Sequence, residues 1–349
     1  MRLDFIDLPA AKPPDVHGAP IPKGFKPGLV SVILPTFNRA SFLPTAMKSV
    51  WQQTYRPVEL LIVDDGSTDN SAEQAQETAD SWPNDPAFSA IYLRQANRGA
   101  SAARNQGLLH SRGEFIQYLD SDDVLVRHKL ASHVSVLQAD EALDIVWSDW
   151  LVVPSGELQR HLEQANLLGL GPEETTWQAT KKTIPWEPWP TLTRRRFVAQ
   201  HSAWNEKTSR WDDWEYALRI MAADPKRAFA PGTVCIQGEH ELGRRRDFDF
   251  DPAGVEKGLV AAREAGAALI HGSESRPEYD QLVADRYWEV FIESLHHGSH
   301  SQTSEAIKGA CRYGRRTPFR MKAIFLNIFL HIGGAKATSV LLRRRYFRD

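Results

Sequence analysis

The chain alternates short apolar runs with longer stretches in which apolar residues recur every three or four positions. The short runs are rich in branched side chains and free of glycine and proline, which is typical of buried strands. The longer stretches have the spacing of amphipathic helices. Strands are predicted at residues 29–34, 58–63, 91–93, 114–119 and 144–148, and helices at residues 41–51, 68–81, 97–107 and 127–138. This alternation predicts an α/β domain with a mainly parallel sheet flanked by helices.

Three of the predicted strands end directly in polar residues. The run at 58–63 stops at Asp64 and Asp65, and polar residues also follow at 35–39 and at 120–123. In open α/β sheets, ligands bind beyond the carboxyl ends of the strands. An Asp-Gly-Ser sequence is also a common turn, so one such end alone would leave the function open. Three of them in one domain indicate a binding site.

Two carboxylates at the last of these ends suggest a metal. Asp120 and Asp122 follow an apolar run. Hard divalent cations take oxygen ligands, and Mg²⁺ is usually bound by one or two carboxylates together with substrate phosphates. Most Asp-x-Asp pairs are solvated turns or helix caps, but the position after a strand favours a cation that neutralises a diphosphate.

The other strand ends carry groups suited to a nucleotide. Asp64 and Asp65 can accept hydrogen bonds from a base or ribose, and Phe37 can stack on a base or belong to the core. Arg98 and Arg104 suit phosphate oxygens, although helix-surface arginines have the same pattern. A glycine-rich phosphate loop of the dehydrogenase or kinase type is absent from the sequence, which argues against both classes.

Composition narrows the class further. The 349 residues carry 42 basic and 44 acidic side chains, a net charge of -2, so nothing indicates a nucleic-acid partner. Cys235 and Cys311 are too few for a disulfide framework or a cysteine metal site. The sequence has neither a signal-peptide pattern nor an apolar run of 18 residues. These features favour a cytoplasmic enzyme.

Four linked motifs carry a family resemblance. The stretches at 32–39, 63–69, 97–107 and 118–123 resemble, in order and spacing, those of the family 2 glycosyltransferases. The resemblance implies a GT-A fold, a nucleotide-sugar donor, Mn²⁺ or Mg²⁺, and inversion at the anomeric carbon. It extends strongly over residues 29–150, more loosely over 190–240, and is absent beyond residue 251.

The resemblance also implies a set of site residues. Asp122 is the leading metal ligand, and Asp120 is its weaker companion. The expected nucleotide-sugar-binding residues are Pro35, Thr36, Phe37, Arg39, Asp64, Asp65, Arg104, Asp120, Ser121 and Asp122.

The catalytic base is expected at the start of a late helix. Family members carry a Glu-Asp pair there, and Asp212-Asp213 fits the place with aspartate replacing the glutamate. Asp213 is therefore the expected base, although both carboxylates also suit a helix cap. A histidine downstream of the base often contacts the metal or diphosphate, which makes His240 a third candidate ligand.

The expected organisation has three parts. A proline-rich, irregular leader occupies residues 1–28, and the GT-A domain occupies 29–250, with a nucleotide-sugar half at 29–150 and an acceptor half at 151–250. Residues 251–349 are expected to form a helical, basic extension. Six of the 11 tryptophans lie between Trp177 and Trp214, where they can form sugar-stacking walls or core.

The expected activity is metal-dependent inverting transfer of a sugar, from a UDP-sugar by family precedent, to a glycan or lipid-linked hydroxyl in surface polysaccharide synthesis. Two alternatives remain. A nucleotidyltransferase normally has a glycine-rich basic loop after the first strand, which residues 35–39 lack. A non-catalytic glycan-binding protein would have no need of Asp65, Asp120, Asp122 and Asp213 together. The sequence does not define the oligomeric state.

The C-terminal region suggests contact with an anionic membrane surface. Residues 301–349 hold 11 basic and two acidic side chains, a difference of +9, beside the apolar stretch at 323–330. A basic helix on the protein core has the same composition. Each basic residue near an anionic bilayer contributes roughly 1 kcal/mol, and salt weakens the attraction. The expected location is therefore the cytoplasm, with peripheral attachment to the inner membrane face if the tail binds lipid.

We predict that the full chain sediments with anionic vesicles at low salt and is released at high salt. Removal of residues 317–349 should reduce this binding, while the α/β domain stays folded because its motifs precede residue 150. Sedimentation with neutral vesicles is the control. A full chain that ignores anionic vesicles at low salt would contradict the prediction.

Overall fold

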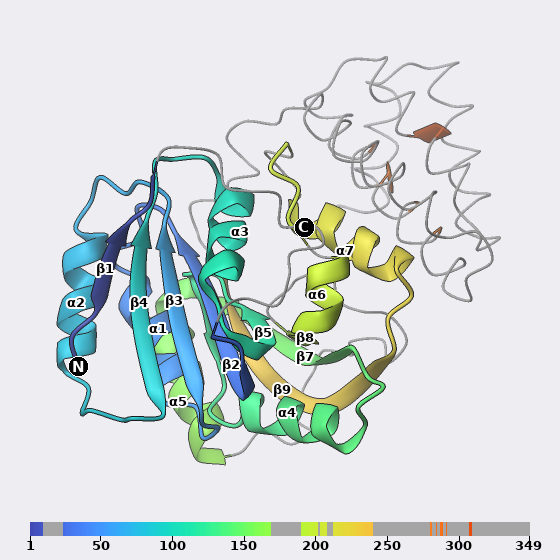
Figure 1. Cartoon of the computed structure of the whole chain (residues 1–349), viewed down its shortest axis with the longest axis horizontal. Coiled ribbons are helices and arrows are strands. Elements are labelled where there is room, and N and C mark those ends of the chain that lie inside the picture. The colour runs from blue at the N-terminus through green and yellow to red at the C-terminus, as the bar shows by residue number, and fades with distance from the viewer. Residues whose placement is uncertain are drawn as a thin grey trace, which may run out of the picture. The chain divides into compact units, whose positions relative to one another are not determined.

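The computed structural model describes residues 1–9, 24–168, 190–201, 203–207 and 212–239, together with seven single positions of the C-terminal part. The chain divides into two compact units. The first comprises residues 1–220 and 225–244, and the second comprises residues 221–224 and 245–349. The sheet and the acidic motifs belong to the first unit (Figure 1).

A mixed sheet forms the centre of this unit. Its nine strands lie in the order β1-β4-β3-β2-β5-β8-β7-β9-β6. The first five run parallel, β8 is antiparallel to both neighbours, and β6 is antiparallel to β9. The strands are β1 (Asp4–Asp7), β2 (Lys26–Thr36), β3 (Val58–Asp64), β4 (Phe88–Arg94), β5 (Gly113–Tyr118), β6 (Asp123–Leu125), β7 (Ile145–Pro154), β8 (Thr191–Arg194) and β9 (Arg227–Glu239). The predicted α/β class with a mostly parallel sheet is confirmed.

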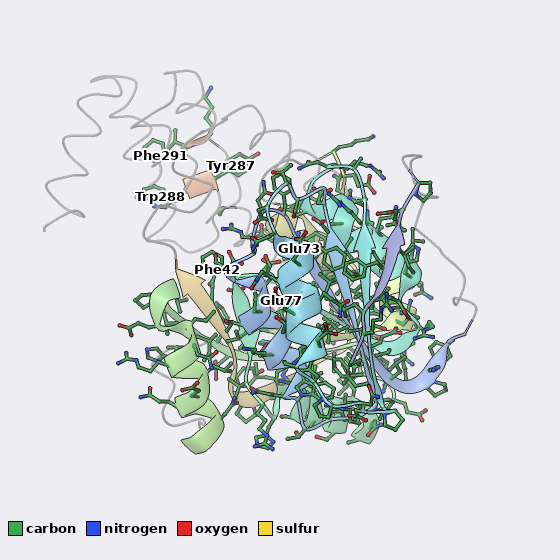
Figure 2. All side chains as sticks on the ribbon, turned by 90° about the vertical axis from the view of Figure 1, so that its left-hand side faces the viewer. Phe42, Glu73, Glu77, Tyr287, Trp288 and Phe291 are labelled. Carbon is green, nitrogen blue, oxygen red and sulfur yellow. The ribbon has the colours of Figure 1, made fainter. Side chains whose placement is uncertain are left out.

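Helices cover both faces of the sheet (Figure 1). They are α1 (Leu43–Trp51), α2 (Ser71–Asp80), α3 (Ala100–His110), α4 (Lys129–Ala139), α5 (Leu158–Leu168), α6 (Arg195–His201) and α7 (Asp212–Ala222), with a short 3₁₀ turn at Ser155–Glu157. Figure 2 shows Glu73 and Glu77 on the exposed side of α2, while Ala75 and Ala79 on its other side are buried.

Alternate residues of β2 serve the two faces, as a pleated strand requires. Val30, Val32 and Leu34 join the main core with buried residues of α1, α2 and α4. Ile33 points the other way, toward α3. There Gly107 approaches so closely that a Cβ atom would overlap the Cγ2 atom of Ile33. The lack of a side chain at Gly107 therefore lets α3 pack closely against the sheet.

Several boundaries differ from the sequence prediction. The leader was expected to be irregular, but Asp4–Asp7 form β1, which pairs with β4 at the edge of the sheet. The aspartates expected in a loop after the fourth strand include Asp123, which begins β6. The strands β8 and β9 were not predicted, because their partners lie far away in sequence and their patterns are short or interrupted by Gly and Pro.

In the second unit, the described positions from Asp280 to Lys308 are helical. Phe291 is fully buried, and its ring lies 5.4 Å from that of Trp288, with Tyr287 beside it in sequence (Figure 2). The rest of the predicted helical extension, including the basic tail at 309–349, lies outside the described residues. No helix among the described residues is long and apolar enough to span a membrane.

We predict that Gly107→Ala destabilises the first unit by about 1–3 kcal/mol, because the new methyl group overpacks the interface between α3 and the sheet. The added Cβ would also lie 3.2 Å from the Cγ2 atom of Val63. The measurement is urea unfolding. Gly156→Ala is the matched control, since no neighbouring atom lies within 4 Å of its Cβ position. Equal stability of the two variants would contradict the close approach.

Candidate active site

The parallel strands β2, β3, β4 and β5 are neighbours, so their carboxyl ends meet at one edge of the sheet. The loops that leave these ends cover residues 37–42, 65–70, 95–99 and 119–122. Leu119 continues the ladder by donating its backbone N–H to the carbonyl oxygen of Ile33 at 3.0 Å. The predicted binding residues that follow the three polar strand ends therefore lie at one edge of the sheet.

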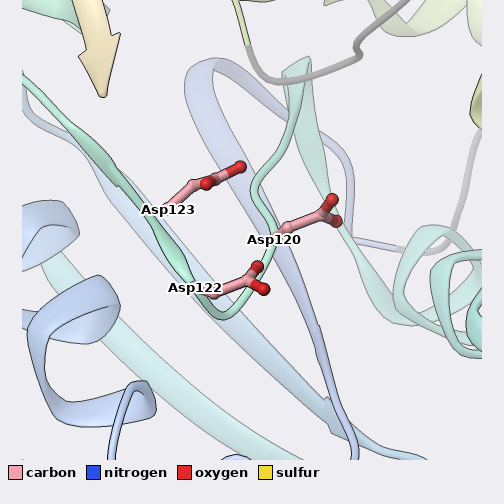
Figure 3. A group of neighbouring side chains, drawn as sticks. All are labelled: Asp120, Asp122 and Asp123. Carbon is pink, nitrogen blue, oxygen red and sulfur yellow. The ribbon is translucent and has the colours of Figure 1, made fainter. Parts of the chain in front are cut away.

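Three carboxylates converge at this edge (Figure 3). One carboxylate oxygen from each of Asp120, Asp122 and Asp123 lies within 4.8 Å of the others. Asp120 and Asp122 are partly exposed, whereas Asp123 is buried and accepts a hydrogen bond from the Gly238 backbone at 3.1 Å. Sequence reasoning named the first two residues and missed Asp123, because a second adjacent aspartate reads as part of the same turn.

The acidic cluster suits a divalent cation. Burial raises the pKa of Asp120, and the charge of Asp122 raises it further, while Arg104 acts in the opposite direction. Close carboxylates in a partly buried place repel one another, and a hard cation relieves that repulsion. Arg39 already contributes positive charge here, with its Nη2 atom 3.7 Å from Oδ2 of Asp122.

Asp65 organises the loop after β4. Its carboxylate accepts hydrogen bonds from Gln95 Nε2 at 2.7 Å, from the Arg98 N–H at 2.8 Å and from the Gly99 N–H at 2.7 Å. Gly99 adopts φ +94°, which other residues rarely reach. The carboxylate therefore fixes the turn that starts α3.

The adjacent Asp64 caps its own loop. Its Oδ1 atom accepts the Ser67 N–H at 2.8 Å, and its Oδ2 atom lies 3.7 Å from Nε of Arg94. Both aspartates are buried. The predicted nucleoside contacts thus come from carboxylates that also hold the backbone in place.

Further hydrogen bonds join the loops after β2 and β3. The Asn38 N–H donates to Ser67 Oγ at 2.9 Å, and the Asn38 side chain accepts the Thr68 N–H at 2.8 Å. The Ala40 N–H donates to Asp69 at 3.1 Å. Because side-chain oxygens of each loop accept hydrogen bonds from backbone N–H groups of the other, the two loops form one framework.

Two buried polar atoms beside this framework have no hydrogen-bond partner among the described residues. They are the hydroxyl oxygen of Thr36 and the Oε1 atom of Gln95. Buried polar groups are normally paired, so orphaned ones indicate a ligand or an ordered water. Of the other predicted contacts, Pro35 and Ser121 are buried and Phe37 is partly exposed.

Arg104 connects the acidic cluster to α7. The guanidinium donates to Asp120 at 2.8 Å and to Asp212 at 2.7 Å, and Ser101 donates to the same Asp212 oxygen at 3.1 Å. Burial alone would lower the pKa of Arg104, but the two carboxylates outweigh it and raise the pKa. The expected donor-site arginine therefore lies between the predicted metal ligands and the predicted catalytic helix.

Aromatic rings form a floor beneath this arginine. The Arg104 guanidinium lies 4.2 Å above the Trp204 ring, which stacks on Tyr216 of α7 at 4.1 Å. Tyr118 meets the Trp204 ring edge-on at 5.3 Å. Trp204 is buried, so it belongs to this floor and not to an exposed sugar-stacking wall. The side chains of the other five tryptophans in that stretch lie outside the described residues.

The loop that carries Trp204 is held to α3. Asn105 donates to the Trp204 carbonyl at 2.9 Å and accepts the Trp204 N–H at 2.8 Å. Glu206 binds both Asn105 at 3.0 Å and Arg98 at 2.6 Å, so the Arg98 guanidinium considered for phosphate is engaged within the protein. These contacts were not predictable, because they join residues about 100 positions apart.

The first turn of α7 carries three acidic residues with different surroundings. Glu215 is buried and forms two hydrogen bonds of 2.8 Å with Arg219. Asp212 is bound by Arg104 and Ser101. Asp213 is partly exposed and contributes to the electrostatic field at Arg104. His240, the predicted third metal ligand, lies outside the described residues.

Comparison with known proteins agrees with this geometry. Residues 31–202 match the sequence model of the family described as glycosyl transferase family 2. The chain is 36% identical over 109 residues to the UDP-Glc:alpha-D-GlcNAc-diphosphoundecaprenol beta-1,3-glucosyltransferase WfgD of Escherichia coli, covering 31% of this chain and 41% of WfgD. It spans about two-fifths of the length of the curated relatives that it matches most strongly.

Solved structures share the fold over most of the chain. S. aureus TarS 1–349 in complex with UDP-GlcNAc superposes with a TM-score of 0.62 at 15% identity, covering 91% of this chain and 93% of TarS. The mannosyltransferase PcManGT of Pyrobaculum calidifontis, in complex with GDP-Man and Mn²⁺, gives a TM-score of 0.51 at 17% identity, covering 95% and 90%. The expected GT-A fold is thereby confirmed.

Proposed function

The chain belongs to glycosyl transferase family 2, and on that basis we propose that it transfers a sugar from a nucleotide-sugar to an acceptor hydroxyl. The observation that carries the proposal is the arrangement around Arg104. This guanidinium touches Asp120 of the acidic cluster on one side and Asp212 at the start of α7 on the other. The residues proposed for the leaving group and for the base are thus next to each other.

The proposed donor is a UDP-sugar. Thr36 Oγ1 and Gln95 Oε1, two of the buried atoms without a hydrogen-bond partner among the described residues, suit the polar edges of a nucleoside. Asp64 and Asp65 contribute carboxylates nearby, and Phe37 contributes a ring at the end of β2. TarS is known with UDP-GlcNAc bound and WfgD is named for UDP-Glc, which favours uridine.

The proposed metal is Mg²⁺ or Mn²⁺ held by Asp122 and Asp120, with Asp123 as a third carboxylate. Such an ion would supply positive charge to the diphosphate as it leaves. Arg39 and Arg104 would orient the phosphate oxygens from two sides of the cluster. PcManGT, which has the same fold, has a solved structure in complex with GDP-Man and Mn²⁺.

The proposed base is Asp213. It follows Asp212 in the first turn of α7, and Arg104 and Ser101 hold Asp212 beside the acidic cluster. Asp213 would accept the proton of the acceptor hydroxyl while the oxygen attacks the anomeric carbon. The bond to the diphosphate breaks on the opposite face, so the configuration inverts. The helix N-terminus favours the ionised carboxylate.

The proposed acceptor is a glycan or lipid-linked sugar of a surface polysaccharide, used at the cytoplasmic face of the membrane. WfgD, as its name states, acts on a sugar linked to diphosphoundecaprenol. A screen of nucleotide-sugars in Mn²⁺ for thermal stabilisation would identify the donor, because a ligand that binds the folded state stabilises it. Free nucleoside diphosphate as a product would exclude a nucleotidyltransferase.

We predict that Asp122→Asn lowers turnover by a factor on the order of 100 and weakens UDP binding in Mn²⁺, because the cation loses its main carboxylate. The measurements are UDP release and calorimetric UDP affinity. Asp80→Asn, the same change on the exposed side of α2, is the control. Unchanged metal-dependent binding in Asp122→Asn would exclude Asp122 as the ligand.

We predict that Asp213→Asn reduces transfer by about 10²–10⁴-fold while UDP affinity in Mn²⁺ changes little, because the base acts on the acceptor. Transfer rate and UDP affinity are measured on the same preparation. Near wild-type transfer by this variant would rule out Asp213 as the base.

A further inference from the structure

The single guanidinium of Arg104 contacts two carboxylates. Its side chain is 6% exposed, and separate nitrogens reach Asp120 at 2.8 Å and Asp212 at 2.7 Å. Asp120 follows β5 at the donor end of the sheet, and Asp212 opens α7. The buried Arg104 guanidinium therefore links the end of β5 to the start of α7.

Neighbouring side chains hold the Arg104 guanidinium in place. The Trp204 ring lies beneath it at 4.2 Å, and Asn105, the next residue of α3, fixes the Trp204 backbone from both sides. Ser101, one turn earlier on α3, holds the same Asp212 oxygen. These contacts hold the guanidinium between Asp120 and Asp212, so both carboxylates share its attraction.

We infer that Arg104 is a positioning residue that makes donor binding at Asp120 and the placement of the base helix α7 interdependent. The inference rests on the proposed function and concerns how that site is regulated. When a metal and a diphosphate take up the charge of Asp120, Arg104 interacts more strongly with Asp212 and holds the start of α7. The base would thus be fixed when a donor is bound.

The coupling has a sign that can be tested, because coupling between two sites is reciprocal. Removing the charge of Asp212 leaves Arg104 with Asp120 as its main partner. Arg104 then competes more strongly with the metal ion for the Asp120 carboxylate. Asp212 is bound to Arg104 and Ser101. The change at Asp212 on α7 should therefore weaken nucleotide binding through its effect on Arg104.

The experiment is calorimetric titration of the full chain with UDP in Mn²⁺. Asp212→Asn should weaken UDP binding by about fivefold or more, the lower range of typical coupling between sites. Asp85→Asn is the matched control: it removes the same charge from an aspartate that is bound to Arg56 at 2.7 Å in the loop before β4, and it should change the affinity less than about twofold.

The Arg104→Lys variant, used as a second background for the Asp212→Asn change, isolates the role of the guanidinium. Lysine keeps the charge but lacks the planar fork that reaches two carboxylates at once. In Arg104→Lys, the further change Asp212→Asn should alter UDP affinity less than about twofold, because the link is already broken. If Asp212→Asn does not fold by circular dichroism, Asp212→Ser replaces it, since serine is well tolerated at a helix start.

The outcomes separate the two proposals. Equal UDP affinities of Asp212→Asn and Asp85→Asn would overturn the coupling while leaving the donor site intact. An Asp212→Asn effect that persists in Arg104→Lys would show that the link does not pass through Arg104. Failure of the wild-type chain to bind UDP in Mn²⁺ would overturn the proposed donor, and the coupling with it.

Discussion

The candidate site depends on how backbone groups are satisfied where the parallel strands end. A ladder pairs the N–H groups inside a sheet, but the loops beyond it must find other partners. The Asp65 carboxylate takes two such groups from residues 98 and 99, and Asn38, Ser67 and Asp69 tie the loops after β2 and β3 together. Without these side chains, the loops at the edge that carries the candidate site would be independent of one another.

The sequence predicted this edge well because its signals are local. A branched apolar run followed by Asp64 and Asp65 marks a buried strand and its end, and the same holds for the run before Asp120. The order of motifs then indicated the family and the GT-A fold. The expected roles of these residues remain predictions, because the structure gives their positions and contacts but not their chemistry.

The remainder of the site was out of reach because it depends on distant pairs. Nothing near Arg104 in sequence indicates that Asp212 will bind it 108 positions later, and Asn105 meets Trp204 across 99 positions. Similarly, β8 inserts antiparallel between β5 and β7, a choice set by packing and not by its own four residues. Local patterns predict elements, whereas these contacts decide how the elements meet.

The framework of loops also has an evolutionary consequence. Asn38 adopts φ 52° and makes its contacts with Ser67 and Thr68, whereas the side chain of its neighbour Arg39 forms an ion pair with Asp122. Positions whose side chains do not build the framework can change without collapsing it. If Phe37 and Arg39 contact the donor as proposed, donor preference can change at these two positions while Asn38 is retained, so the loop would separate the selection for stability from the selection for substrate.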